Sequence, residues 1–255
     1  MQNIIDSYPS LARLKRRIAA LGPAPEQKSL KRISFGFAPL DMRLGGGLAR
    51  GAVHELLPRT AGDAASTAAF ALMLARRADP VAPILWIAAD AQLRAGGTPY
   101  GPGLAELGIA PDRLLLVAAP DEAAVLKAAN DALACAGLGA VLLDIGPARR
   151  LDLTASRRLV LASERSGVTA LILRQGDGAM ASAAASRWQV AAAPSTPLAG
   201  QAPGRTMLTL ALLRHRGGAQ PFDMMVEWNN DDQVFCAPTL LRDLSTPVER
   251  RQMVA

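Results

Sequence analysis

The stretch SFGFAPLDMRLGGGLARGAVHEL, from Ser34 to Leu56, decides the fold. Three consecutive glycines at residues 45–47 precede an apolar run at residues 52–57, which is typical of a buried β-strand. A turn-rich loop, PRTAGDAAST, follows at residues 58–67, and a helix pattern rich in small residues begins within it. A strand that enters a loop and then a helix is the arrangement that holds phosphate groups in many α/β proteins. The stretch therefore places the candidate ligand site at this loop.

The loop departs from the phosphate-loop pattern G-x-x-x-x-G-K-[ST] where that pattern carries its chemistry. If Gly62 is the second glycine, Asp63 replaces the lysine and Ala64 replaces the magnesium-binding hydroxyl residue. Leu57 stands at the first glycine, and the shifted hydroxyls of residues 66–67 have no lysine beside them. A carboxylate here would face a polyanion, and like charges repel by about 4 kcal/mol at 4 Å near a protein surface. We therefore expect no catalytic residue, no ATPase activity and no cofactor, with Asp63 capping a helix that begins near Ala64.

Apolar runs alternate with helical patterns through the middle of the chain. The expected strands are AVHELL, PILWIAA, RLLLVAA, GAVLLDI and VTALILR, and the expected helices are residues 64–77, 103–107, 121–136 and 152–166. This alternation predicts an α/β fold with a mainly parallel, twisted sheet flanked by helices. After Arg187 only strand patterns remain: WQVAAAP, RTMLTLALLRHR, FDMMVEW and QVFCAP. These predict antiparallel strands that extend the sheet.

Charge and composition restrict the class of protein. Half of the residues are hydrophobic, which suits a packed core. No apolar run reaches the roughly 18 residues of a membrane span, so no membrane contact is expected. Cys135 and Cys236 are far apart and have no metal-ligand spacing, so we expect no metal, a cytoplasmic location and Cys135 as a small core residue. The net charge of +6 resides in residues 1–50, where nine Lys and Arg face three Asp and Glu.

The N-terminal segment reads as a short basic amphipathic helix. Its apolar side chains recur at helical spacing, and basic residues occupy the other faces. It is either a helix packed on the core or a docking surface for a partner; the residues proposed for docking are Leu11, Leu14, Arg16, Arg17 and Ile18. The expected organisation is residues 1–32 as helix and linker, residues 33–237 as the core, and residues 238–255 as a mobile polar tail.

The opening stretch resembles the entry to the RecA-type ATPase core, which has the form S-x-G-x-x-x-L-D-x-x-L-G-G-G-L-x-x-G. The matching positions are Ser34, Gly36, Leu40, Asp41, Leu44, Gly45, Gly46, Gly47, Leu48 and Gly51. By this resemblance Asp144 stands at the Walker B strand end, Asp90 at the catalytic glutamate and Gln175 at the nucleotide-sensing glutamine. The degenerate nucleotide site would then comprise Arg59, Gly62, Asp63, Asp90, Asp144 and Gln175. Both expected DNA-binding loops are short or absent.

A RecA-like scaffold with a degenerate Walker A loop and trimmed DNA loops resembles the ImuA family of damage-induced mutagenesis. The resemblance implies a non-catalytic accessory protein of a bacterial translesion synthesis complex. Its implied partners are an ImuB-type, Y-family-like protein and an error-prone DnaE-type polymerase, with RecA as a further candidate.

Two other interpretations stay open. In one, the chain is a nucleotide-binding or weakly ATP-hydrolysing regulator in which Arg59 substitutes for the lysine. In the other, it is a DNA-binding module or a SulA-like inhibitor of cell division, in which Arg214, His215 and Arg216 are either weak phosphate contacts or an exposed hairpin turn. Three further side chains are expected in the core: His54, Trp86 and Trp188. The alternatives are an interface residue or a catalytic base for His54, and a platform that stacks on a nucleic-acid base for Trp188.

Overall fold

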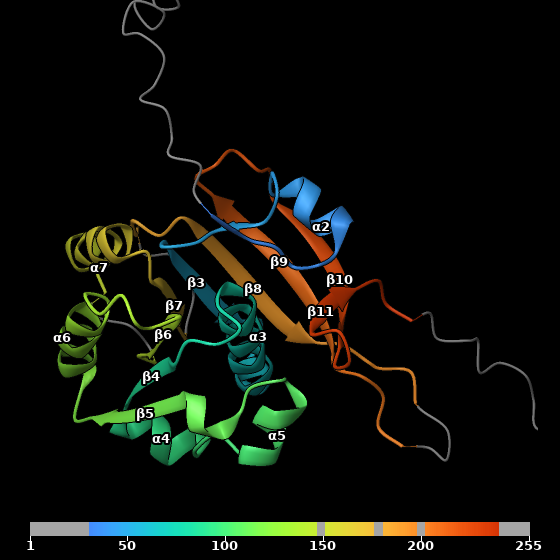
Figure 1. Cartoon of the computed structure of the whole chain (residues 1–255), viewed down its shortest axis with the longest axis horizontal. Helices are drawn as coiled ribbons and strands as arrows, with labels where there is room; N and C mark the ends of the chain where they lie inside the picture. The colour runs from blue at the N-terminus through green and yellow to red at the C-terminus, as the bar shows by residue number, and fades with distance from the viewer. Residues whose placement is uncertain (1–30, 147–150, 176–180, 198–201, 240–255) are drawn as a thin grey trace, which may run out of the picture. The chain divides into compact units, whose positions relative to one another are not determined.

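A computed structural model describes residues 31–146, 151–175, 181–197 and 202–239. Within it, nine strands form one sheet in the order β11-β10-β9-β8-β3-β7-β6-β4-β5 (Figure 1). The strands are β3 (Val53–Pro58), β4 (Ile84–Ala89), β5 (Leu114–Ala119), β6 (Ala140–Asp144), β7 (Thr169–Leu173), β8 (Ser186–Ala192), β9 (Met207–His215), β10 (Phe222–Asn229) and β11 (Val234–Cys236). Strand β3, which follows the glycine-rich stretch, is therefore central, and β5 lies at one edge.

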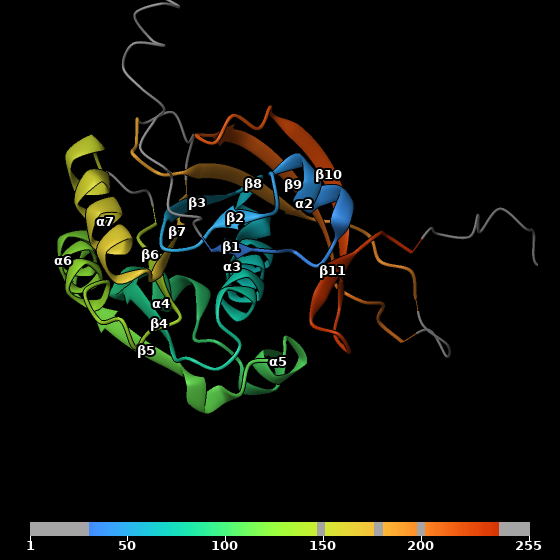
Figure 2. The same cartoon turned by 45° about the horizontal axis from the view of Figure 1, so that its top comes forward.

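Helices cover both faces of this sheet (Figure 2). They are α2 (Ala38–Arg43), α3 (Ala64–Ala78), α4 (Asp90–Gly96), α5 (Gly101–Glu106), α6 (Glu122–Ala132) and α7 (Leu153–Ser166). On one face, Phe70 of α3 packs against Trp188 and Phe35 in the larger apolar cluster. On the other face, α6 and α7 supply the second cluster through side chains such as Val125 and Leu159. The chain thus forms the α/β layers that its alternating pattern predicts.

The two outer helices begin and end where their sequences dictate. The Asp121 carboxylate accepts a hydrogen bond from the Ala124 amide at the start of α6. Asp152 does the same for the Ala155 amide at the start of α7, so each helix has a side-chain N-cap. Helix α7 stops at Gly167, whose φ of 78° is the left-handed conformation that glycine adopts without strain.

The glycine-rich stretch folds as a compact turn around one carboxylate. It lies between the short strands β1 (Arg32–Ile33) and β2 (Leu48–Ala49), which pair antiparallel. Asp41 accepts hydrogen bonds from the Ser34 hydroxyl at 2.7 Å and from the Phe35 amide at 2.8 Å. Gly47 has a φ of 108°, and a Cβ there would lie 2.2 Å from a carbonyl oxygen of β1. The residues of the motif are therefore explained by the turn they build.

The strand-only region is antiparallel except for its first strand. β9, β10 and β11 pair antiparallel in succession, as predicted. β8 pairs antiparallel with β9 but parallel with β3, so the antiparallel prediction for WQVAAAP is wrong on that side. The parallel block of the sheet therefore extends one strand further than expected.

The prediction that Cys135 belongs to the core is wrong. Helix α6 ends at Ala132, and the following residues form turns in which the Cys135 amide donates to the carbonyl of Ala132. Cys135 is consequently exposed. In contrast, the core positions expected for Trp86 and Trp188 are confirmed, since both side chains are buried.

His54 is also a core residue. Its Nε2 donates to the carbonyl of Ala49, so its Nδ1 accepts from the Ser186 hydroxyl at 2.7 Å. The Ser186 oxygen in turn accepts from the Trp188 indole N–H. Burial lowers the pKa of His54 from 6.5 to about 4, so the ring is neutral at physiological pH.

Candidate functional site

The Asp63 carboxylate ties the loop after β3 to Thr60 and to strand β8. Asp63 accepts hydrogen bonds from both the amide and the hydroxyl of Thr60, closing a single 3₁₀ turn at Ala61–Asp63. Its second oxygen accepts from the Ala192 amide at the end of β8, at 2.9 Å. These hydrogen bonds lower the pKa of Asp63 and so stabilise its ionised form. The bond from the Thr60 hydroxyl has the largest effect.

The predicted role of Asp63 as a cap is therefore corrected in one respect. Helix α3 begins at Ala64, as expected, but the Asp63 side chain makes no cap hydrogen bond to it. The carboxylate turns back toward Thr60 and β8 because the 3₁₀ turn intervenes between strand and helix.

Beside this loop lies a small cavity at the carboxyl ends of β6 and β7. Its volume is about 40 Å³, and its lining comprises Pro58, Ala64, Thr67, Ala68, Asp144, Leu173, Arg174 and Gln175. The structure thus brings Asp144 and Gln175 together, as the resemblance implies. Ordinary ligand cavities measure about 300–1,000 Å³, whereas about 10–15 Å³ is enough for one water molecule. At about 40 Å³ the cavity has room for water and is well below the size of an ordinary ligand cavity.

The Thr67 hydroxyl, which lines this cavity, is engaged within its own helix. Thr67 is buried in the first turns of α3, and its hydroxyl donates to the carbonyl of Asp63 at 2.9 Å. Within the residues that the structure describes, no group of three or more His, Cys, Asp or Glu side chains is placed to hold a metal ion.

Asp144 carries the unusual electrostatics of this cavity. Burial raises its pKa from 3.8 to about 6, and a hydrogen bond from the Gly146 amide offsets part of that effect. No described Lys or Arg forms an ion pair with it. A carboxyl that titrates near neutral pH can release or take up a proton there.

The remaining predicted nucleotide-site residues lie outside the cavity. Arg59 and Gly62 are exposed on the loop, and Asp90 begins α4, so none of the three lines the cavity. Gln175 donates through its side-chain amide to Gln92 of α4 at 2.9 Å, and its backbone amide donates to the Gly146 carbonyl. Gln92 carries no motif, so the sequence offered no signal for this contact.

A buried ion cluster, formed by Glu55 with Arg174 and Arg187, was not predicted from the sequence. Glu55 of β3 is completely buried and accepts from Arg174 at 2.9 Å and from Arg187 at 2.6 Å. Arg174 follows β7 and Arg187 lies in β8, so one carboxylate joins the central strand to both of its neighbours. A glutamate inside the apolar run AVHELL was the signal that a buried cation should be sought.

The predicted phosphate-contacting residues are divided between two environments. Arg214 is half-buried and donates to the carbonyls of Ser182 and Ala184, so its guanidinium holds the segment before β8. His215 lies at the end of β9, and burial lowers its pKa. Arg216 is exposed in the turn between β9 and β10. The predicted docking residues 11–18 and nearly all of the predicted tail lie outside the described residues, and DNA contact stays a prediction.

Comparison with known proteins identifies the family. No protein-family model matches the chain. ImuA proteins from two strains of Caulobacter vibrioides are each 37% identical to it over 180 residues, which cover 65% of this chain and 70% of theirs. The chain belongs to the ImuA family. The crystal structure of the RadB recombinase matches this ImuA-family fold with a TM-score of 0.56 at 14% identity, covering 80% of the chain and 99% of RadB. The predicted RecA-like core is thereby confirmed.

Proposed function

We propose that the chain is a non-catalytic scaffold protein of a bacterial translesion synthesis complex and acts in damage-induced mutagenesis. Membership of the ImuA family supports the accessory role. The observation that carries the non-catalytic part is the state of the loop after β3. There Asp63 ties the loop to Thr60 and β8 at the position where a phosphate-binding lysine would stand.

The cavity supports the same proposal. A volume of about 40 Å³ leaves no space for a nucleotide unless the loop opens. Opening would break the hydrogen bonds of Asp63, which are exposed to solvent and together contribute about 1–2 kcal/mol. These features support a scaffold that has no catalytic residue and needs no cofactor.

Protein contacts then carry the function. The proposed partners are an ImuB-type, Y-family-like protein and an error-prone DnaE-type polymerase, with RecA as a third, in the cytoplasm. Residues Leu11, Leu14 and Ile18 would supply an apolar docking stripe, with Arg16 and Arg17 beside it. DNA contact would be weak and confined to Arg216 in the β9–β10 turn. No helix among the described residues is long and apolar enough to cross a membrane.

The test is complementation in a bacterium that lacks its own ImuA. The full chain should restore mutation after ultraviolet damage, and purified protein should release no phosphate from ATP. Substituting Leu11, Leu14 and Ile18 together by Ser in the full chain should abolish co-purification with the ImuB-type partner. Failure to restore mutagenesis, despite normal protein levels, would refute the accessory role; ATP turnover that is lost in Asp144→Asn would refute the non-catalytic one.

One observation favours a second candidate, a nucleotide-responsive regulator. Asp144 and Gln175 meet at the cavity, and Gln175 contacts Gln92 of α4, so a bound phosphate would be sensed by two elements. Calorimetry with Mg-ATP separates the candidates. Binding without turnover would support the regulator, and an absence of heat at millimolar ATP would support the scaffold.

A further inference from the structure

A groove lies on the outer surface of helices α6 and α7. None of the residues predicted for the nucleotide site lines it. Its volume is about 330 Å³, roughly eight times that of the cavity beside Asp144. Its lining comprises Ala123, Leu126, Lys127, Asn130, Ala155, Arg158 and Leu159. The four residues from α6 recur at intervals of three, one and three, so they form one face of that helix. The groove follows this face along α7 for about two helical turns.

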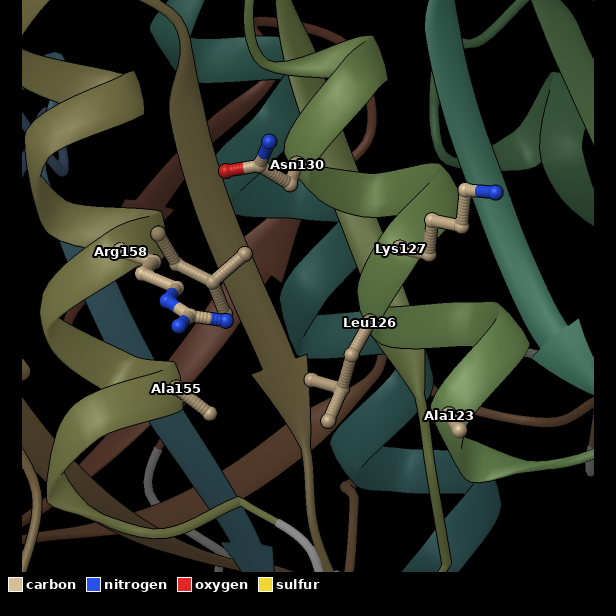
Figure 3. Close-up of a pocket in the computed structure, with 7 residues that line it drawn as sticks. Ala123, Leu126, Lys127, Asn130, Ala155 and Arg158 are labelled. Carbon is tan, nitrogen blue, oxygen red and sulfur yellow. The ribbon is translucent and has the colours of Figure 1, made fainter.

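The floor of the groove is aliphatic. Leu126 and Leu159 form the floor, and the small side chains of Ala123 and Ala155 leave it open at one end. Figure 3 shows the Arg158 guanidinium reaching from α7 over the gap toward Leu126. These apolar side chains can accept another apolar side chain, which would be desolvated on binding.

Polar donors point over this floor from both helices. The Asn130 amide points from α6 toward α7, opposite Arg158, while Lys127 extends away along the outer side of α6 (Figure 3). Arg158 and Asn130 are exposed, and neither side chain makes a hydrogen bond or ion pair with another described residue. No acidic residue lines the groove. The groove therefore offers a cation with five donors and an amide to an occupant, and no carboxylate of its own.

We propose that this groove binds an acidic amphipathic segment of a protein partner. An apolar side chain of that segment enters between Leu126 and Leu159, and a carboxylate next to it pairs with Arg158. The Asn130 amide hydrogen-bonds to the backbone or a polar side chain of the same segment. The inference rests on the proposed function, since a scaffold must hold its partners through surfaces other than a catalytic site.

Charge complementarity decides the occupant. A cationic or neutral segment would leave the Arg158 guanidinium partly desolvated without a partner, which costs free energy. A guanidinium donates two parallel hydrogen bonds to a carboxylate, and such charge-assisted pairs are the stronger hydrogen bonds. The basic N-terminal segment of this chain, at residues 10–21, is consequently a poor occupant of the groove.

The test uses the full-length protein and a fluorescent acidic peptide with leucines on one helical face and glutamates beside them. A twin peptide with lysines in place of the glutamates is the probe control. Arg158→Glu is the test substitution. Arg157→Glu is the matched control, because Arg157 is the preceding residue of α7, is exposed and does not line the groove. A third variant, Ala123→Phe, fills the open end from an exposed position of α6.

The acidic peptide should bind saturably by fluorescence anisotropy, more weakly at high salt, and the lysine twin should not bind. Arg158→Glu and Ala123→Phe should each weaken binding at least about tenfold, whereas Arg157→Glu should change it less than about twofold, with all three variants unfolding at the same temperature as the native protein. Equal loss in the two arginine variants, or no saturable binding, would overturn the groove proposal.

Failure of the groove is distinguishable from failure of the function. A chain that binds the peptide but does not restore damage-induced mutagenesis refutes the proposed function and leaves the groove as a docking site. A chain that restores mutagenesis and binds no acidic peptide refutes the groove alone.

Discussion

Asp144→Asn should stabilise the fold at neutral pH, because burial makes the ionised carboxylate unfavourable in the folded state. The pKa of Asp144 rises from 3.8 to about 6. One pK unit corresponds to about 1.4 kcal/mol, so ionised Asp144 lowers the free energy of unfolding at pH 7 by about 3 kcal/mol. Asparagine has nearly the same shape, and its oxygen can still accept from the Gly146 amide. We expect a gain of about 2–3 kcal/mol, since a buried amide retains part of the desolvation cost.

The sign of the pH dependence follows from the direction of the shift. Because the folded pKa is the higher one, the folded state holds its proton more tightly than the unfolded chain. The unfavourable contribution of Asp144 is therefore complete above about pH 6 and vanishes as the pH falls below about 4.

His54 titrates in the opposite sense over the same range. Its folded pKa of about 4 lies below the unfolded value of 6.5, so the unfolded chain takes up the proton first on acidification. Stability contributed by neutral His54 is complete above pH 6.5, and about 3 kcal/mol is lost by pH 4. In the native protein the two groups largely cancel. The difference between Asp144→Asn and the native protein is the contribution of Asp144 itself, so the variant should lose about 2 kcal/mol more than the native protein between pH 7 and pH 4.

Urea unfolding followed by tryptophan fluorescence provides the assay, since Trp188 and Trp228 are completely buried. Asp223→Asn is the control, because that carboxyl is exposed on β10 and its substitution should change stability by less than about 0.5 kcal/mol. A variant no more stable than the native protein at pH 7, or two parallel pH curves, would refute the reasoning. Mg-ATP should leave both proteins unchanged; if it stabilised only the native one, Asp144 would be a magnesium ligand and the regulator would be the better proposal.

Four further outcomes are expected. Glu55→Gln should cost about 3–5 kcal/mol in urea unfolding, because two buried guanidinium groups lose their carboxylate; a cost below 1 kcal/mol would contradict the ion cluster. Asp63→Ala should cost about 1–2 kcal/mol by the same method and should still give no ATP binding in calorimetry; ATP binding by this variant would show that the Asp63 carboxylate alone had closed the loop to nucleotide. Leu116→Lys should reduce concentration-dependent association in sedimentation, because β5 is an edge strand with exposed apolar side chains; unchanged association would show that this edge is not used. Cys135 is exposed and should react with a thiol reagent faster than Cys236, whose pKa is raised by burial. Mass spectrometry of the labelled protein measures the order, and faster labelling of Cys236 would contradict this prediction.

Much of the architecture was predictable because buried parallel strands are written as continuous apolar runs. GAVLLDI and VTALILR correspond to β6 and β7 within one or two residues. The direction of β8 was not predictable in this way. Two parallel strands are usually connected by a helix, which is visible in the sequence as a helical pattern. Residues 174–185, between β7 and β8, carry no such pattern. Strand-only patterning therefore favoured the antiparallel choice.

The C-terminal end of helix α6 was less predictable than the strands, because the sequence there is rich in alanine. Alanine suits both a helix and a turn, so periodicity continues past Ala132 to Ala136 although the helix stops. Cys135 follows the end of this helix. The helical pattern predicts it in the core, whereas the structure exposes it on the surface.

Of the residues predicted for the nucleotide site, only Asp144 and Gln175 line the cavity, and the contacts around the site were not predictable. Replacement of the lysine by Asp63 was visible in the loop itself. The partner that gives this carboxylate its role, the amide of Ala192, is 129 residues away. Likewise, the small volume beside Asp144 depends on how Thr67 and Leu173 pack, which no local pattern specifies.

The central position of β3 in the sheet determines the order in which the sheet can form during synthesis. Both of its neighbours in the sheet, β7 and β8, are made long after it, and Glu55 is 132 residues from Arg187. At ribosomal speeds of roughly 5–20 residues per second, β3 waits on the order of 10 s for the strands that enclose it. During that time its apolar side chains and its glutamate are available to chaperones, and the cluster around Glu55 can close only after most of the chain has been synthesised.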